Sequence, residues 1–474
     1  MSAELDGALA EIRSGPTGAQ IAAIFDFGGT VVDGFPRPGT FRRLFRRRGA
    51  EEVLLRGIRN GATDGEYGRF LNQLAEALAG RSEADLDALG ERLFRRTVYG
   101  HLYFEAWQLI RTHQAAGHTI VLASSLTRFQ VAPAAAELGI EQVLYTPMAA
   151  QDGILTGYPD GKTLWRNGKA DAVREFAVGH EVDLTRSYAY ADSTADLPLL
   201  SLVGHPTAVN PDQELTSVAA ERNWPALRFH PRQGARPADY ARTTAGFAGL
   251  LGGAFYGVAS KSPTRDHRQM ADALLEHAAG NTLSLAGVHL RVSGAQNARA
   301  PRPAVFLFNH QSQFDIIIVP EVLQGGVTGI GKKELTRNPV FGPLMRFVGV
   351  TFIDRSSTDK AKAALAPVVD TLRGGLSIAV APEGTRSYTP DVGPFKKGAF
   401  HIAIQAGVPV IPIVIRNAGE ICWRNSMVAR PGTVDVAILD PIDVSGWDPN
   451  DLDDKVAAVR QLYVDTLLDW PKPD

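Results

Sequence analysis

The sequence predicts an α/β protein built from two units, each a parallel sheet with helices between its strands. Short apolar runs alternate with helical patterns over residues 104–229, which is typical of a parallel sheet with crossover helices. The same alternation resumes near residue 283 and continues to about residue 470. A length of 474 residues is also too great for one ordinary domain. The Pro-, Gly- and Arg-rich stretch 232–239 marks a boundary between the two regions.

The composition excludes several classes of protein. Apolar residues make up 45% and charged residues 21%, so the chain is globular rather than disordered. Lys and Arg number 49 against 51 Asp and Glu, which leaves no global basic field, and we expect no nucleic-acid partner. A single cysteine, Cys422, excludes an intramolecular disulfide. The first twenty residues carry charges and no apolar core, so we expect no signal peptide.

The first unit begins with an apolar run, residues 21–25, that reads as a buried strand ending at Asp26. Residues 42–97 have a helical pattern with few strand signals. Strands are predicted at 118–123 and 187–191 and a helix at 131–138. The helical part contains a basic face, which either faces solvent or binds anionic lipid. It is formed by Arg42, Arg43, Arg46, Arg47 and Arg48.

Residues 243–260 form an uncharged stretch of 18 residues between Arg242 and Lys261. As a helix it would be roughly 27 Å long, near the thickness of a bilayer's hydrocarbon core. Its Gly and Ala content makes it weakly hydrophobic, so both a soluble linker helix and a membrane-associated helix fit the pattern. Gly249, Gly253 and Gly257 would let another helix approach closely, either residues 268–277 or a second copy in a homodimer.

In the second unit, an apolar run at 303–308 precedes a loop with His310 and a helix beginning near Asp315. If Asp315 lies in the first helical turn and reaches back, the two side chains form a base and the group that orients it. A capping box between Ser312 and Asp315 explains the same spacing.

Basic residues follow other strand-like runs of this unit. Residues 377–381 are followed by the loop Pro382, Glu383, Gly384, Thr385 and Arg386. Its glycine lets a substrate approach the backbone closely, and its arginine can bind a phosphate through two hydrogen bonds. Arg355 follows the apolar residues Phe352 and Ile353, and further cations are Lys332, Lys333, Lys396 and Lys397. This concentration of charge in a neutral protein predicts a local anion site.

Together these segments resemble the glycerolipid acyltransferase family, specifically the 1-acyl-glycerol-3-phosphate acyltransferases. Five blocks agree in order within a unit of about 190 residues: His310 and Asp315, residues 331–335 around Lys332, the block ending at Arg355, Glu383–Arg386, and residues 410–413. The resemblance implies that His310 takes the proton of the acceptor hydroxyl while Asp315 orients the imidazole. It implies that Lys332, Arg355, Glu383, Gly384, Thr385 and Arg386 hold the acceptor, and that no metal is needed.

The first unit resembles the haloacid-dehalogenase superfamily, in its phosphoserine phosphatase-like branch. That family has Asp-x-Asp-x-Thr after the first strand, and here Asp26 and Thr30 match but Gly28 replaces the second aspartate, which protonates the leaving group. The resemblance implies a Rossmann-like parallel sheet with a helical cap at about 34–103. It further implies phosphate binding by Ser124 and Lys169 and Mg²⁺ binding by Asp26, Asp192 and Asp196. Asp33 is a poor substitute for the missing acid.

These observations predict a phosphatase-like domain (18–238), a linker with a membrane-associated helix (239–281) and a lysophospholipid acyltransferase domain (282–474). The expected reaction moves an acyl chain from acyl-CoA or acyl-ACP to 1-acyl-sn-glycerol-3-phosphate, giving phosphatidic acid. We expect a peripheral or monotopic protein on the cytoplasmic face of a membrane, with a weak or inactive phosphatase-like domain. The alternatives are a bifunctional phosphatase and acyltransferase, a phosphatase whose second half binds lipid, and a first half that serves only as a scaffold or regulatory domain.

Overall fold

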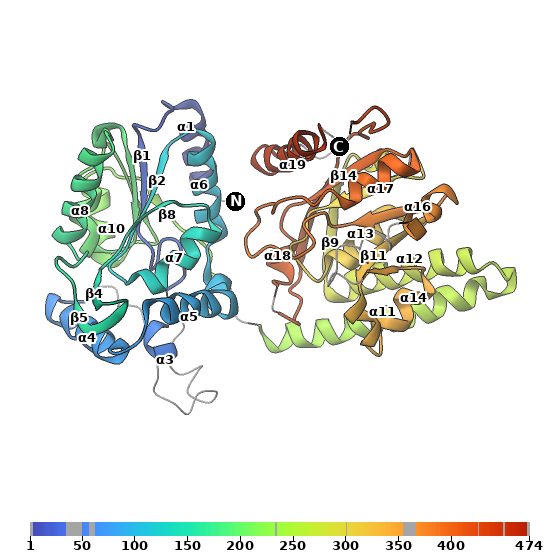
Figure 1. The fold of residues 1–474 in the computed structure, drawn as a ribbon, viewed down its shortest axis with the longest axis horizontal. Helices are drawn as coiled ribbons and strands as arrows, with labels where there is room; N and C mark the ends of the chain where they lie inside the picture. The colour runs from blue at the N-terminus through green and yellow to red at the C-terminus, as the bar shows by residue number, and fades with distance from the viewer. Residues whose placement is uncertain are drawn as a thin grey trace. The chain divides into compact units, whose positions relative to one another are not determined.

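The computed structural model describes residues 3–34, 50–55, 62–232, 235–299, 301–353, 366–424, 426–448 and 451–471. The chain forms two compact units, residues 1–233 and 234–474. Each is a sheet with helices on its faces, as the alternating sequence pattern predicts (Figure 1). Arg355 and the arginines at 42–48 lie outside the described residues.

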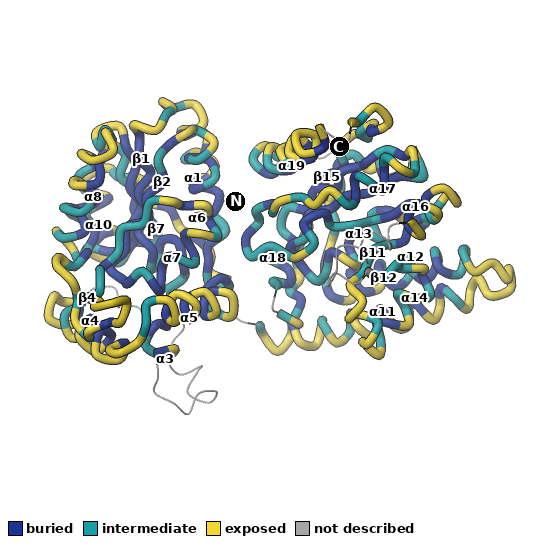
Figure 2. The backbone as a smooth tube through the Cα atoms, in the orientation of Figure 1, coloured by how far each residue is buried: buried dark blue, intermediate teal, exposed yellow. Residues whose placement is uncertain are grey.

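The first unit is built on a parallel six-stranded sheet of order β3-β2-β1-β6-β7-β8. Its strands are β1 (Ala22–Phe25), β2 (Thr119–Ala123), β3 (Gln142–Leu144), β6 (Tyr188–Ala191), β7 (His205–Val209) and β8 (Ala226–Leu227). Its helices outside the cap are α1 (Ala3–Ser14), α6 (Phe104–Ala115), α7 (Arg128–Glu137), α8 (Asn167–Gly179), α9 (Leu197–Leu200) and α10 (Gln213–Glu221). The central strands β1 and β6 are wholly buried, which explains why they read as unbroken apolar runs. Figure 2 shows β1 in the colour of buried residues.

A helical cap follows β1, and its described helices are α3 (Ala50–Leu54), α4 (Asp64–Leu78) and α5 (Glu83–Arg96). A capping box between Thr63 and Glu66 begins α4, and Ser82 caps α5. A two-stranded hairpin, β4 (Met148–Gln151) and β5 (Ile154–Pro159), packs beside α4. The Tyr67 ring on α4 stacks on Trp165 with ring centroids 4.6 Å apart, so an aromatic contact joins the cap to the segment before α8.

The second unit has a seven-stranded sheet of order β12-β11-β13-β10-β14-β15-β9. Among the described ladders of this sheet, only the β14–β15 pair is antiparallel. The strands are β9 (Val288–Ser293), β10 (Val305–Phe308), β11 (Val327–Lys332), β12 (Thr351–Ile353), β13 (Ser377–Val380), β14 (Val410–Ile415) and β15 (Gly432–Ile438). The helices after β9 are α13 (Asp315–Leu323), α14 (Phe341–Phe347), α16 (Ala366–Arg373), α17 (Gly398–Ala406), α18 (Ala418–Ile421) and α19 (Leu452–Leu468).

The glycine-rich stretch forms α11 (Pro237–Lys261), which packs along α12 (His267–Ala286) as a helical hairpin (Figure 1). The structure places this hairpin in the second unit, where the sequence suggested a linker. Gly253 and Gly257 lie against the α12 backbone at His277 and Ala273, where a Cβ atom would overlap the carbonyl oxygens. Within the described residues, no helix combines the length and hydrophobicity needed to cross a membrane.

Candidate functional site

In the second unit, His310 and Asp315 lie at the carboxyl end of the central strand β10. His310 is in the loop after the strand, and Asp315 is the first residue of α13. His310 Nδ1 is 2.8 Å from Asp315 Oδ2, and the aspartate is fully buried. Because a carboxylate oxygen can only accept a hydrogen bond, the proton of this hydrogen bond is on Nδ1 of His310. In the neutral ring, Nε2 therefore keeps its lone pair.

Backbone groups hold this pair in place. Asp315 Oδ2 also accepts hydrogen bonds from the backbone N–H groups of Gln311 and Ser312, both at 2.8 Å. Asn309 makes two hydrogen bonds to the backbone of Ile415 on β14, so the loop is anchored to the neighbouring strand. The Ser312 hydroxyl donates to Cys422 O and accepts from Phe314 N, so it does not complete the capping box with Asp315.

Glu383 links the histidine loop to the loop that follows β13. Its Oε1 accepts from His310 N at 2.7 Å, and its Oε2 accepts from Gly393 N at 2.9 Å. Burial raises the pKa of Glu383 to about 7, against the opposing effect of these two hydrogen bonds. Gly384 has a φ of +75°, a left-handed conformation that favours glycine. Ser387 N donates to His310 O at 2.9 Å, so both the backbone N–H and the backbone C=O of His310 are hydrogen-bonded to the Glu383 loop.

Arg386 interlocks with Arg424, a residue that the sequence analysis missed. Arg386 Nη1 donates to Arg424 O at 2.7 Å, and the Arg424 guanidinium donates to Arg386 O and to Thr385 Oγ1. The Arg424 guanidinium also lies 4.0 Å from the Tyr388 ring centroid, a cation–π contact. An arginine in a loop after a strand is a weak signal, and nothing in the sequence pairs it with Arg386, 38 residues earlier.

The remaining predicted acceptor residues are only partly placed. Lys332 is the last residue of β11, and its side chain is exposed. Because β11, β13 and β10 are neighbouring parallel strands, Lys332 lies at the same sheet edge as His310 and Glu383. Arg355 is two residues beyond β12, outside the described residues.

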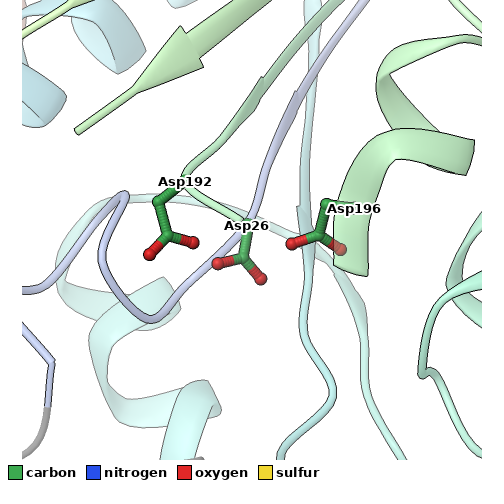
Figure 3. Close-up of side chains that lie close together, drawn as sticks. All are labelled: Asp26, Asp192 and Asp196. Atoms are coloured by element: carbon green, nitrogen blue, oxygen red, sulfur yellow. The ribbon is translucent and has the colours of Figure 1, made fainter. Parts of the chain in front are cut away.

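In the first unit, three aspartates meet at the carboxyl edge of the sheet. Asp26 follows β1, Asp192 follows β6, and Asp196 precedes α9. One carboxylate oxygen from each lies within 4.8 Å of the others, and all three residues are buried (Figure 3). The Lys169 ammonium is 2.7 Å from Asp26 Oδ1 and 2.6 Å from Asp196 Oδ1.

The charges of this cluster fit a divalent cation. Burial raises the pKa of Asp26, an effect that the Lys169 ammonium opposes. Burial lowers the pKa of Lys169, but Asp196 and Asp26 together hold it above its ordinary value, so the amine stays protonated. Three carboxylates against one ammonium leave buried negative charge, and hard oxygen ligands suit Mg²⁺. Asp26, Asp192 and Asp196 would therefore hold the ion.

Two buried hydroxyls lie on the loops around this cluster. Thr30 is fully buried, and its Oγ1 has no hydrogen-bond partner among the residues that the structure describes. Ser124, directly after β2, accepts from Leu126 N at 3.2 Å. A phosphate oxygen at this edge of the sheet would give the Thr30 hydroxyl an acceptor.

The two adjacent glycines of the Asp26 loop differ. Gly29 has a φ of +85°, and a Cβ atom there would overlap Asp192 Oδ2. Gly28 has no positive φ, and a Cβ atom built on it meets nothing within 4 Å. The backbone conformation therefore requires a glycine at position 29 but not at position 28, where a Cβ atom has room.

Comparison with known proteins assigns both units. Residues 289–416 match the acyltransferase family model, and residues 23–201 match the model of the haloacid dehalogenase-like hydrolases. His310 and Asp315 thus lie in the segment that matches the acyltransferase model, and the three aspartates lie in the segment that matches the haloacid dehalogenase-like hydrolase model.

Individual relatives narrow the acyltransferase assignment. The chain is 33% identical over 201 residues to the 1-acyl-sn-glycerol-3-phosphate acyltransferase of Salmonella typhimurium, covering 42% of this chain and 81% of that protein. The coconut (Cocos nucifera) enzyme of the same name is 33% identical over 205 residues, covering 42% of this chain. The present chain spans 65% of the length of that relative. The crystal structure of the corresponding acyltransferase from Thermotoga maritima aligns with a TM-score of 0.43 and 27% identity, covering 50% of this chain and 98% of that one. The chain belongs to the 1-acyl-sn-glycerol-3-phosphate acyltransferase family.

Proposed function

We propose that this protein transfers an acyl chain from an acyl thioester, of coenzyme A or of acyl carrier protein, to the free hydroxyl of 1-acyl-sn-glycerol-3-phosphate. The product is phosphatidic acid. The observation that carries the proposal is the His310–Asp315 hydrogen bond at 2.8 Å beside Glu383, in a chain whose relatives bear this activity in their names.

The geometry supports direct transfer without a covalent intermediate. Nε2 of neutral His310 accepts the proton of the acceptor hydroxyl, whose oxygen attacks the thioester carbonyl carbon. Asp315 holds the ring in the required tautomer and stabilises the imidazolium that forms. When the tetrahedral intermediate collapses, the C–S bond breaks and the imidazolium returns its proton to the departing thiolate. Arg386, with Lys332 at the same sheet edge, supplies positive charge for the acceptor phosphate.

The test is a donor-by-acceptor screen on the purified full chain, scored by lipid mass analysis. His310→Ala should lose orders of magnitude in turnover while remaining folded. His289→Ala is the matched control, because His289 is an exposed histidine on β9. Near-normal transfer by His310→Ala would refute the assignment of the base. Product formation from every acceptor except lysophosphatidate would refute the assignment of the substrate.

The hairpin would bring this site to the cytoplasmic face of a membrane as a peripheral or monotopic anchor. Phe255 is 79% exposed and Tyr256 60% exposed on α11, and Phe247 and Leu251 on the same helix are exposed as well. Exposed apolar and aromatic side chains that follow one helix suit the bilayer interface. Phe255→Ser with Tyr256→Ser should reduce flotation with anionic vesicles. The control pair is Tyr158→Ser with Val178→Ser, also exposed but in the first unit. Equal flotation of both pairs would contradict this anchor.

The phosphatase-like domain should turn over phosphate esters of alcohols poorly. Asp26 can attack phosphorus, but Gly28 cannot protonate the departing alkoxide, and a positioned acid is worth about 10²–10⁴-fold. The alternative of a phosphatase with a lipid-binding second half is disfavoured by this glycine and by the intact His310–Asp315 pair. Rapid Mg²⁺-dependent hydrolysis of phosphoserine that Asp26→Asn abolishes would instead make the chain bifunctional.

A further inference from the structure

The Asp26 site retains the groups that attack and bind a phosphoryl group but lacks a group that moves a proton at position 28. Asp26 is held by the Lys169 ammonium at 2.7 Å, and the Thr30 hydroxyl is buried without a partner among the described residues. Asp192 and Asp196 complete the acidic cluster. A phosphatase reaction has two half-reactions, transfer of the phosphoryl group to the aspartate and hydrolysis of the aspartyl phosphate. The two half-reactions differ in whether they need a group that moves a proton.

We propose that Asp26 accepts a phosphoryl group from acyl phosphates and related phosphoric anhydrides, and that the resulting aspartyl phosphate is long-lived. The domain would then carry a phosphorylated state instead of releasing phosphate at each turnover. This inference rests on the proposed loss of the acid at position 28 and is independent of the acyltransferase reaction.

The first half-reaction needs no proton when the donor is an acyl phosphate. A lone pair of Asp26 forms the new O–P bond, and the bond from phosphorus to the acyl oxygen breaks with both electrons remaining on the departing carboxylate. Carboxyl groups are already ionised at neutral pH, since they titrate near pH 4. The carboxylate therefore leaves as a stable anion, and a glycine at 28 costs nothing in this step. An alcohol phosphate would have to expel an alkoxide without help.

The second half-reaction does need a proton acceptor. A water oxygen must attack phosphorus, the Asp26–phosphorus bond must break with its electrons returning to the carboxylate, and the proton of the water must go to a base. Asp196 is paired with Lys169 at 2.6 Å, and Asp192 is a metal ligand of the cluster in this assignment. Asp33 accepts a hydrogen bond from the Tyr103 hydroxyl at 3.1 Å. Hydrolysis of the aspartyl phosphate should therefore be slow.

The loop geometry provides a matched set of variants. Because a Cβ at position 28 meets nothing within 4 Å and the φ there is not positive, Gly28→Ala fits the loop, and Gly28→Asp begins from the same open Cβ position. The alanine variant adds bulk without a proton-transferring group, and the aspartate variant adds that group. Acyltransfer to lysophosphatidate reports on the second unit alone, so amide hydrogen exchange over β1 and β6, measured on each variant, reports whether the first unit remains folded.

The experiment incubates the full chain with Mg²⁺ and acetyl phosphate, quenches in acid and measures intact protein mass. We expect the mass of one added phosphoryl group in the wild type and in Gly28→Ala, and none in Asp26→Asn. After removal of the donor, Gly28→Asp should lose its phosphoryl group about 10²–10⁴-fold faster than the wild type. The same variant should release phosphate continuously while donor is present.

Three results would overturn the inference. One is the absence of a phosphoryl group on the wild type in the presence of Mg²⁺ and acetyl phosphate. Another is a phosphoryl group that persists in Asp26→Asn, which places the modification elsewhere. The third is a wild-type lifetime as short as that of Gly28→Asp, which Asp33→Asn then extends, because this would identify Asp33 as the missing base.

Discussion

Two neighbouring glycines of α11 should respond in opposite directions to the same substitution. Gly253 is buried against α12, where a new Cβ would overlap His277 O and lie 2.9 Å from Ala278 Cα. Gly252 is exposed, and a new Cβ there meets nothing within 4 Å. Both residues lie within the same helix, so the intrinsic gain from replacing glycine by alanine is the same for both.

The expected magnitudes follow from these contacts. Gly252→Ala should stabilise the hairpin by about 0.5–1 kcal/mol, the usual difference in helix propensity. Gly253→Ala gains the same amount but forces two backbones apart, since the 2.9 Å approach is well inside the ordinary carbon–carbon separation of about 3.5–4.0 Å. Separation also loosens the small core between the helices, which contains Leu250 and Leu274. Overpacking costs about 1–3 kcal/mol, so the net change should be a loss of about 1–2 kcal/mol.

Amide hydrogen exchange over α11 and α12 is the appropriate measurement, because a chain of two units does not unfold as one two-state system. Gly252→Ala should slow exchange in the hairpin and Gly253→Ala should accelerate it, relative to the wild type. Equal effects of the two substitutions, in either direction, would show that the glycines do not serve close helix packing.

The acyltransferase site yields three further predictions. Arg424→Ala and Arg386→Ala should each raise the KM for lysophosphatidate more than the KM for the acyl donor, because a lost charge-assisted hydrogen bond is worth about 1.5–3 kcal/mol. An effect confined to the KM for the donor would exclude a role in acceptor binding. Asp315→Asn should lower kcat by about 10²–10⁴-fold without unfolding the unit, since an amide cannot stabilise the charged imidazole of His310, and an unchanged kcat would exclude it as the orienting group. Burial raises the pKa of Glu383 to about 7, so between pH 4.5 and 7 the folded unit retains a proton that the unfolded chain releases. The free energy of unfolding should therefore fall by about 3 kcal/mol as the pH rises from 4.5 to 7. Glu383→Gln should flatten this dependence, as measured by amide hydrogen exchange over β10 and β13 at several pH values and corrected for the intrinsic exchange rate, and an unaltered slope would contradict the shift.

Local pattern was sufficient to predict the sheets but not the contacts between their loops. Val305–Phe308 is apolar because the whole strand is buried, and Ser377–Val380 is largely apolar with its first two residues buried, so both runs could be recognised from sequence. His310 and Asp315 could be paired because they are five residues apart. The hydrogen bonds from His310 N to Glu383 and from Arg424 to Arg386 depend on which strands are neighbours, and strand order leaves no mark in a single sequence.

The glycine-rich stretch shows a different limit. The spacing of Gly249, Gly253 and Gly257 predicted a close helix contact but left its partner open between residues 268–277 and a second chain. In the structure α12 runs antiparallel to α11 and contacts this glycine face along its length, from Ala273 to Thr282. The choice depends on the short turn between the helices, Ser262–Thr264, which brings α12 back along the same face.

The Asp26 loop separates two reasons for a glycine that sequence alone cannot distinguish. The backbone conformation requires a glycine at position 29, because its φ is positive and a side chain would collide with Asp192. Gly28 has neither constraint, so the absence of a carboxylate there is not imposed by the backbone. The chemical consequence can therefore be considered by itself: the attacking aspartate remains, the ammonium that holds it remains, and only proton transfer is lost. A site altered in that one respect favours donors whose leaving group departs as a stable anion, and it slows the return of Asp26 to its free carboxylate.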